Sequence, residues 1–443
     1  MNLLENIRNA GVIGAGGAGF PTHVKLNANA EYILLNGAEC EPLLRVDQQL
    51  MAVKGKEVIT GLHMAGELVG AKKKIIGIKV KHKDVIQSLR KDIKELSLED
   101  KMEVRELPDI YPAGDEQVLV YELTGRVVPE TGIPIAVGCV VINTETALNV
   151  FNASQGKPVT EKYVTIAGDV PNPVTVKTPV GTPLKILFEI AGRSDLIGYE
   201  VVDGGPMMGH LLCDRDGFVT RKTKGLVVLE ENHSLIHKKK KTMRSAVLMN
   251  KTACEQCRMC TDLCPRFLLG HSTSPHKMVR AVGFGLEADE SKTVALTCCQ
   301  CNLCEYFSCP AGINPKMANA YYMAKLREKG VKHKAIVKEF KPREMREYRL
   351  VPSKRLIARL KIQRFDVKAP LDLKNEIVPD FVGISLNDFV GVSALPVVKI
   401  GDMVEAGEKI GEIPENSLGA SVHSSIAGRV ESIENNFIKI RRN

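Results

Sequence analysis

Most of the cysteines in this chain are gathered in one short stretch. Nine of the twelve fall between residues 254 and 309, and eight of these form two similar runs. In each run three cysteines stand two residues apart, and a fourth, followed by proline, comes soon after. The first run holds Cys254, Cys257, Cys260 and Cys264, and the second holds Cys298, Cys301, Cys304 and Cys309. This spacing is typical of [4Fe–4S] ligation, in which one short loop wraps around three corners of a cubane and a distant thiolate binds the fourth. The chain is therefore predicted to carry electrons.

The two runs are expected to exchange their last cysteines. In two-cluster ferredoxins the fourth cysteine of each run ligates the partner cluster. One cluster is then predicted at Cys254, Cys257, Cys260 and Cys309, and the other at Cys298, Cys301, Cys304 and Cys264. Structural zinc is the alternative, but zinc sites usually pair two separated hooks of cysteine or histidine, and disulfides in such tight loops would be strained. Cys299 lies off the pattern and is expected to be a packed thiol rather than a ligand.

Length and composition limit the classes of protein to which the chain can belong. At 443 residues the chain should hold two to four domains, and a hydrophobic content of 44% is ample for buried cores. No apolar run approaches the ~18 residues that a membrane helix needs, and the start of the sequence has no signal-peptide core. A reducing cytoplasmic compartment is therefore expected. The formal charge of +9 does not indicate nucleic-acid binding, because only 5% of residues are aromatic and no groove-reading motif is present.

A glycine-rich loop near the start indicates a phosphate site. Its glycines are Gly14, Gly16, Gly17 and Gly19. The loop satisfies G-x-G-x-x-G with Glu39 about twenty positions further on, but Pro21 and a short spacing to the next strand do not fit a dinucleotide-binding unit. Backbone N–H groups of glycines can approach an anion closely, and Lys25 adds a positive charge. We therefore predict a phosphate cradle suited to flavin mononucleotide (FMN); a glycine turn needed only for packing is the alternative.

Four ordered segments, residues 14–25, 36–42, 111–116 and 141–146, resemble the NADH-oxidising flavoprotein of respiratory complex I. The resemblance implies an FMN site made by Gly14, Gly16, Gly17, Gly19, Lys25, Asn36, Glu39, Tyr111, Gly114, Asp115, Glu116, Asn143 and Thr144. It also implies that Phe20 and Glu41 line the NADH site, the ring by stacking and the carboxylate by bonding ribose or nicotinamide groups. The chain departs from that flavoprotein by replacing its cluster motif with the two cysteine runs, and by having Cys40 where serine is usual.

Changes in the pattern of residues along the chain predict a multidomain α/β architecture. An FMN- and NADH-binding α/β domain is expected at 1–155, and a β-grasp module of the soluble-ligand-binding (SLBB) type at 160–232. An α-helical ferredoxin-like domain with two [4Fe–4S] clusters is expected at 245–330, a charged helical connector at 331–377, and an all-β barrel-sandwich domain at 378–443. The last resembles lipoyl and biotinyl carriers. It has no lysine in the tight turn where a carrier is modified, so a docking or structural role is predicted.

The order of these parts resembles the PduS-type cobalamin reductases of bacterial propanediol-utilisation microcompartments from end to end. Matching stretches include residues 14–25, 36–50, 108–116, 204–209, 254–264 and 348–352. The resemblance implies that NADH reduces FMN, that the clusters pass on single electrons, and that cob(III)alamin or cob(II)alamin is reduced toward cob(I)alamin. Such a reductase would support a B12-dependent diol dehydratase. Its partners would be NADH, cobalamin or a corrinoid-carrying protein, and a shell protein of the microcompartment.

Two other functions fit the same parts. One is that of RnfC, the electron-input component of the Rnf membrane complex, although in RnfC the barrel-sandwich module precedes the flavin domain. The other is a non-enzymatic electron relay to another reductase, against which the presence of Lys25, Asn36 and Asn143 argues. No residue specifies a corrin, so the electron acceptor is the part that the sequence determines least.

Overall fold

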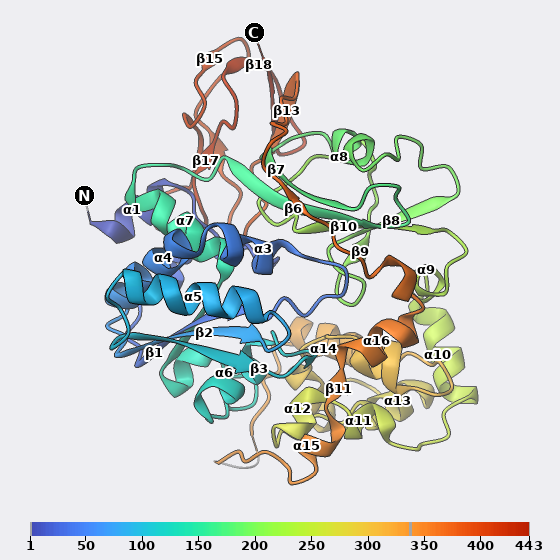
Figure 1. Cartoon of the computed structure of the whole chain (residues 1–443). Helices are drawn as coiled ribbons and strands as arrows, with labels where there is room; N and C mark the ends of the chain where they lie inside the picture. Colours follow the sequence, from blue (N-terminus) through green and yellow to red (C-terminus); the bar gives the residue numbers. More distant parts are fainter. Residues whose placement is uncertain (1, 336–338, 443) are drawn as a thin grey trace.

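A four-stranded parallel sheet forms the first part of the chain (Figure 1). The structure is a computed structural model that describes residues 2–335 and 339–442. The strand order is β3 (Met102–Leu107), β2 (Lys73–Lys79), β1 (Tyr32–Gly37) and β5 (Cys139–Asn143). Parallel strands are buried on both faces and read as continuous apolar runs, as residues 33–35 and 139–142 do.

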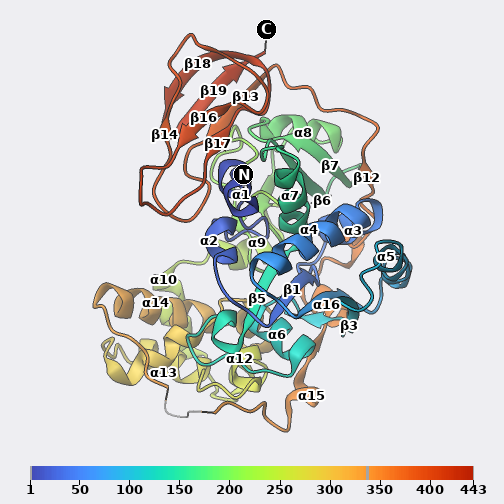
Figure 2. The same ribbon diagram turned by 90° about the vertical axis from the view of Figure 1, so that its left-hand side faces the viewer.

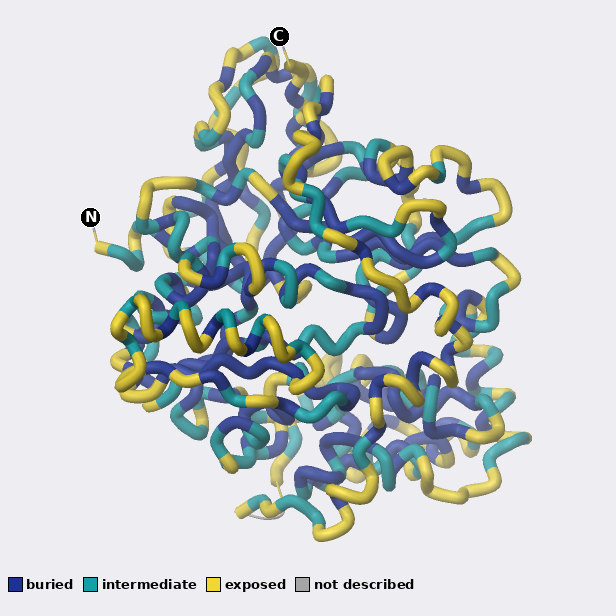
Figure 3. Tube along the Cα trace, in the orientation of Figure 1, coloured by how far each residue is buried: buried dark blue, intermediate teal, exposed yellow. Residues whose placement is uncertain are grey.

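Helices cover both faces of this sheet. They are α1 (Leu3–Asn9), α2 (Thr22–Leu26), α3 (Val46–Val53), α4 (Gly55–Leu68), α5 (Lys83–Glu95), α6 (Glu116–Thr124) and α7 (Thr144–Ser154). Successive strand side chains point to opposite faces. Ile33 and Leu35 accordingly pack in one core with α3, α4, α5 and α7, whereas Leu34 packs in a second core with α6. In the sequence of α5 the buried residues recur at helical spacing, and Figure 3 shows its outer turns exposed.

A six-stranded mixed sheet follows. Its order is β12 (Leu371–Asp372), β7 (Val174–Pro179), β6 (Glu161–Gly168), β10 (Gly225–Glu230), β8 (Tyr199–Asp203) and β9 (His210–Leu211). The strands β6 and β7 form an antiparallel hairpin, β10 runs parallel to β6, and α8 (Leu184–Ile190) packs on the sheet through Leu187 and Phe188. A hairpin, a helix and a further strand packed in this way fit the β-grasp module expected at 160–232.

The cysteine runs lie in a part built from short helices. These are α9 (Ser234–Lys239), α10 (Met243–Thr252), α11 (Met259–Asp262), α12 (Pro265–Leu268), α13 (Pro275–Gly283), η2 (Glu290–Thr297), η3 (Cys304–Ser308) and α14 (Pro315–Glu328). Met278 and Val279 of α13 share one core with Tyr322 and Leu326 of α14. The helix expected between the two runs is α13.

The segment 331–377, expected to be a charged helical connector, has strands as well as helices, and its strands pair with strands of other parts of the chain. It contains α15 (Arg346–Arg349), β11 (Val351–Pro352), α16 (Ser353–Leu360), η4 (Gln363–Phe365) and β12. The strand β11 pairs with β4 (Ile110–Tyr111) of the flavin part, and β12 extends the six-stranded sheet beside β7. Residues 336–338 of this segment lie outside the described residues.

Two small sheets form the C-terminal part, which Figure 2 shows beside α1. One sheet is β13 (Phe381–Ser385), β19 (Phe437–Arg441), β18 (Gly428–Glu434) and β15 (Met403–Val404), and the other is β14 (Leu395–Pro396), β16 (Lys409–Glu412) and β17 (Val422–His423). Ile13, from the start of the chain, is a member of the core between them. Arg221 and Asp388 form a buried ion pair at 2.6 Å that fixes this part to the six-stranded sheet. Along the described ranges, no helix is both long and apolar enough to cross a membrane.

Candidate functional site

Two asparagines stand side by side at the carboxyl edge of the parallel sheet. Asn36 of β1 is the register partner of Asn143 at the end of β5. Open α/β sheets bind ligands just outside the carboxyl ends of their strands. The Nδ2 of Asn36 donates to the carbonyl of Gly114 at 2.9 Å, and the Nδ2 of Asn143 donates to both carboxylate oxygens of Asp47 at 3.1 and 3.2 Å. The structure therefore brings three of the four predicted flavin segments to one edge.

The glycine loop passes over the same edge. A Cβ at Gly16 would lie 3.6 Å from the Cβ of Asn143. Gly17 has a φ of +105°, and a Cβ there would meet no atom of the described residues within 4 Å. The loop closes on itself because the N–H of Gly19 donates to the carbonyl of Gly14 at 3.1 Å. Open glycine backbone beside two side-chain amides fits the phosphate of FMN.

Lys25 also reaches this site. Its Nζ pairs with Glu116 at 2.9 Å, and both side chains are partly exposed. Exposed ion pairs contribute little to stability, so Lys25 is free to turn toward a bound anion. Thr144 begins α7 and is fully buried, and its hydroxyl has no hydrogen-bond partner among the residues that the structure describes.

A cluster of buried and half-buried charges adjoins the asparagines. Its members are Glu39, Asp47, Glu145, Lys162 and Lys224. Asp47 pairs with Lys224, and Glu145 pairs with Lys162 at 2.5 Å. Glu39 accepts the backbone N–H of Asp47 at 2.8 Å at the start of α3. Burial, followed by the charge of Asp47, raises the pKa of Glu39 to about 7. Of these five residues the sequence indicated only Glu39, because Asp47 and Lys224 are 177 positions apart and no spacing rule pairs them.

The turn at residues 111–116 joins the flavin edge to the second cysteine run. The hydroxyl of Tyr111 donates to the carbonyl of Cys301 at 2.7 Å. Asp115 caps α6 and also pairs with Arg266 at 2.8 Å, two residues after Cys264. The N–H of Gly114 donates to the Sγ of Cys40 at 2.9 Å. One side of this turn thus contacts the flavin edge and the other contacts the cluster loops.

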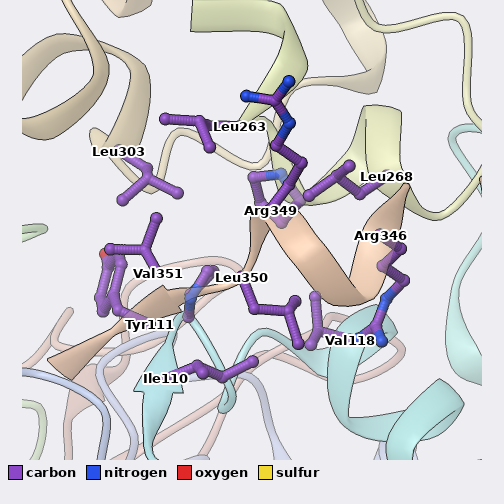
Figure 4. A pocket seen from close by; sticks show the side chains of 12 residues that line it. Ile110, Tyr111, Val118, Leu263, Leu268, Leu303, Arg346, Arg349, Leu350 and Val351 are labelled. Carbon is purple, nitrogen blue, oxygen red and sulfur yellow. The ribbon is translucent and has the colours of Figure 1, made fainter. Parts of the chain in front are cut away.

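The contact between these two parts encloses a small hollow. Its empty volume is about 310 Å³, and it is lined by residues of β4, α12 and β11 and by Leu303 of the second run. Figure 4 shows Tyr111, Leu303 and Val351 around it, with Arg346 and Arg349 contributed by α15. The hollow is partly open, and apart from the two arginines its lining is mostly apolar.

The two cysteine loops have the same backbone shape. Gln256 and Gln300, each the residue before the second cysteine of its run, have φ of +54° and +55°. Arg258 and Asn302, each just after that cysteine, have φ of +63° and +62°. Residues other than glycine adopt this left-handed conformation rarely. The repeated strain at matching positions fits loops that wrap around identical clusters.

The structure gathers the first predicted set of cysteines around one hollow and places members of the second set near one another. Cys254, Cys257, Cys260 and Cys309 line one hollow of about 380 Å³. Burial, followed by the nearby charges of Cys298 and Cys264, raises the pKa of Cys304, and Cys264 also lies close enough to Cys301 to raise its pKa. In the described residues no three His, Cys, Asp or Glu side chains converge on a single ion; a cubane differs because its four thiolates bind four separate irons.

Burial differs between the two sets. In the first set Cys257 is exposed, Cys254 and Cys260 are partly exposed and Cys309 is buried. In the second set Cys298 is partly exposed and Cys264, Cys301 and Cys304 are buried. Burial raises the pKa of Cys260 and of Cys298 to about 12. Free thiols with such pKa values stay protonated at neutral pH, and ligation to iron would deprotonate them. Cys299 is half-buried and packs against the core that contains Cys301.

The two residues predicted for NADH contact different segments. Glu41 accepts the backbone N–H groups of Met207 and Met208, both at 2.8 Å, between β8 and β9. Phe20 follows the glycine loop, where the carbonyl of Gly19 accepts the N–H of Val390 from the C-terminal part at 2.9 Å. Their role with NADH stays a prediction.

The parts of the chain match three known families. Residues 7–152 match the Nuo51 FMN-binding domain, residues 253–314 a 4Fe-4S dicluster domain, and residues 367–442 the RnfC barrel sandwich hybrid domain. The whole chain is 41% identical to "Cobalamin reductase PduS" of Salmonella typhimurium over 99% of this chain and 96% of the relative. The chain belongs to the PduS cobalamin reductase family. The C component of the Na(+)-translocating ferredoxin:NAD(+) oxidoreductase complex of Acetobacterium woodii is 34% identical to it, over 59% of this chain and 57% of its own length.

Membership in the PduS family confirms the multidomain α/β fold with flavin, dicluster and barrel-sandwich parts. The chain is an electron-transfer oxidoreductase whose cofactors are FMN and [4Fe–4S] clusters. Among solved structures, an NAD+-reducing [NiFe]-hydrogenase aligns with a TM-score of 0.48 at 22% identity, covering 82% of this chain and 66% of that chain.

Proposed function

We propose that this chain uses NADH to reduce cob(III)alamin or cob(II)alamin toward cob(I)alamin, in support of a B12-dependent diol dehydratase. FMN accepts a hydride from NADH and [4Fe–4S] clusters carry single electrons, so together they turn a two-electron donor into a one-electron donor. The observation that carries the proposal is the bond from Tyr111 to the Cys301 carbonyl, because it joins the flavin edge directly to a cluster loop.

We assign a separate set of residues to FMN, to NADH and to each cluster. The open loop around Gly17 and the ammonium of Lys25 would hold the FMN phosphate, while Asn36, Asn143 and the turn at 111–116 would orient the ring. Phe20 and Glu41 would contact NADH. The first cluster would take Cys254, Cys257, Cys260 and Cys309, and the second would take Cys298, Cys301, Cys304 and Cys264; the shared hollow and the repeated loop conformation support this assignment.

The exposure of the cysteines suggests where electrons leave the chain. Three of the four cysteines of the second set are buried, whereas three of the four in the first set are at least partly exposed. We infer that cobalamin, or a protein that carries it, approaches the first set. We also propose that the chain divides into five parts with the limits 1–155, 160–232, 245–330, 331–377 and 378–443. The PduS relatives support a location in a propanediol-utilisation microcompartment, with a shell protein as a further partner.

An anaerobic reduction experiment tests the proposal. The protein is reconstituted with iron, sulfide and FMN, and the flavin absorbance near ~450 nm is followed after NADH and then aquacobalamin are added. Bleaching by NADH and reoxidation by aquacobalamin are the expected results. Bleaching without reoxidation would refute the corrin acceptor and favour an acceptor like that of the Rnf relatives. Absence of bleaching would refute NADH as the donor.

A further inference from the structure

Lys224 reaches the flavin edge from a different sheet. It lies immediately before β10, where its carbonyl accepts the N–H of Thr165 at 3.1 Å and so fixes its backbone. A Cβ added to Gly225 would lie 2.2 Å from the Cδ2 of Leu44, so the start of β10 packs directly on the loop between β1 and α3. The six-stranded sheet therefore delivers this lysine into the first part of the chain.

The ammonium of Lys224 meets Asp47, which in turn contacts two of the predicted flavin residues. The Nζ of Lys224 donates to the Oδ2 of Asp47, and the Asp47 side chain is only 2% exposed. The carboxylate of Asp47 also accepts the Nδ2 of Asn143 at 3.1 and 3.2 Å. The backbone N–H of Asp47 donates to Glu39 at 2.8 Å. Asp47 thus connects the lysine to Asn143 and to Glu39.

Carboxylates outnumber lysines beside the asparagines, so Lys224 is needed to neutralise one of them. Three carboxylates, from Glu39, Asp47 and Glu145, face two lysines. Lys162 is engaged by Glu145 at 2.5 Å, which leaves Lys224 as the cation that pairs with Asp47. A buried carboxylate that loses its cation is strongly disfavoured. Without Lys224, Asp47 would have to take up a proton or turn away, and in either case its hold on Asn143 would weaken.

We propose that Lys224 is a positioning residue of the flavin site: by neutralising Asp47 it holds Asn143 in the orientation that binds FMN. This inference rests on the function proposed above. It makes the six-stranded sheet part of the flavin site rather than a spacer between the flavin and cluster parts.

FMN binding to the purified apoprotein tests this role, with quenching of flavin fluorescence as the readout and the melting temperature of each apoprotein recorded beside it. Lys224→Met should raise the Kd for FMN at least about tenfold, which corresponds to about 1.4 kcal/mol. Lys177→Met is the matched control, because Lys177 lies in the same sheet and pairs with Glu161 at 2.7 Å, with both side chains exposed. This control should change the Kd less than about twofold.

A second pair of variants separates positioning from folding. In the Asp47→Asn background the carboxylate that joins Lys224 to Asn143 is gone, so adding Lys224→Met should change the Kd by less than about threefold. This comparison holds even where Lys224→Met alone does not fold. A further tenfold loss in that background, or wild-type affinity in Lys224→Met, would overturn the role of Lys224. Failure of the wild-type apoprotein to bind FMN would instead refute the flavin site itself.

Discussion

Replacing Arg221 by methionine should undock the C-terminal barrel. Arg221 is 4% exposed, and its Nη1 donates to the carbonyls of Gly11 and Ser421, both at 2.9 Å. Its Nε and Nη2 bind the carboxylate of Asp388, which is also buried. Methionine would fill much of the space of the arginine stem but would leave Asp388 without a cation and two carbonyls without donors.

The free energy at stake is several kcal/mol. Removing one partner of a buried ion pair costs about 3–5 kcal/mol, and each lost hydrogen bond to a carbonyl costs about 1 kcal/mol. The docking of the barrel should therefore weaken by about 5–7 kcal/mol. The barrel shares its core with Ile13, so this loss would expose apolar surface at both ends of the chain.

Limited proteolysis and thermal unfolding measure this effect. Lys–Arg-specific cleavage in the segment before β13 should become fast in Arg221→Met and stay slow in the wild type. Arg441→Met is the control, because Arg441 forms an exposed pair with Glu431 on the same barrel, and exposed pairs are worth about 0–1 kcal/mol. Adding Asp388→Asn to Arg221→Met should restore part of the resistance. The reasoning is refuted if Arg221→Met melts and is cleaved like Arg441→Met.

Three further predictions address the redox parts. Tyr111→Phe leaves the buried Cys301 carbonyl without its donor and should lower the free energy of unfolding by about 1–3 kcal/mol; denaturant titration checks this, and an unchanged midpoint would contradict the bond. Cys264→Ser should remove the second cluster and spare the first, as seen by iron analysis and electron paramagnetic resonance; loss of the first cluster alone would contradict the exchange. Burial, followed by the charge of Asp47, raises the pKa of Glu39 from 4.5 to about 7, so the folded protein holds a proton there that the unfolded chain releases. This stabilising contribution is complete below pH 4.5 and is lost as the pH rises through about 7, and Glu39→Gln should flatten the corresponding fall in melting temperature.

Local patterns predicted the parts of this fold well. The cysteine spacing indicated the dicluster part because ligand geometry ties thiolates to fixed positions in one short loop. The glycines at 14–19 indicated the flavin loop because close approach to a phosphate needs backbone without side chains. Both conclusions depend on residues that are neighbours in the sequence, and the family matches confirm a dicluster domain and an FMN-binding domain.

Contacts between the parts could not be predicted in the same way. Tyr111 and Cys301 are 190 positions apart, and Arg221 and Asp388 are 167 apart. A lysine or arginine that will be buried against a distant carboxylate has no local pattern to distinguish it from one on a solvated surface. For this reason the sequence indicated Tyr111 as a flavin contact and missed the bond from its hydroxyl to the cluster loop.

The presence of Ile13 in the core of the C-terminal barrel has a consequence for how such chains evolve. The barrel packs against the residues that lead into the glycine loop. This contact depends on where the barrel lies in the folded protein and not on its position along the chain. A circular permutation that moves the barrel to the front of the chain would keep the same contacts, since domain rearrangements of this kind are tolerated where chain ends lie at the surface. The same contacts are therefore open to a chain whose barrel-sandwich module comes first, which is the order expected for RnfC.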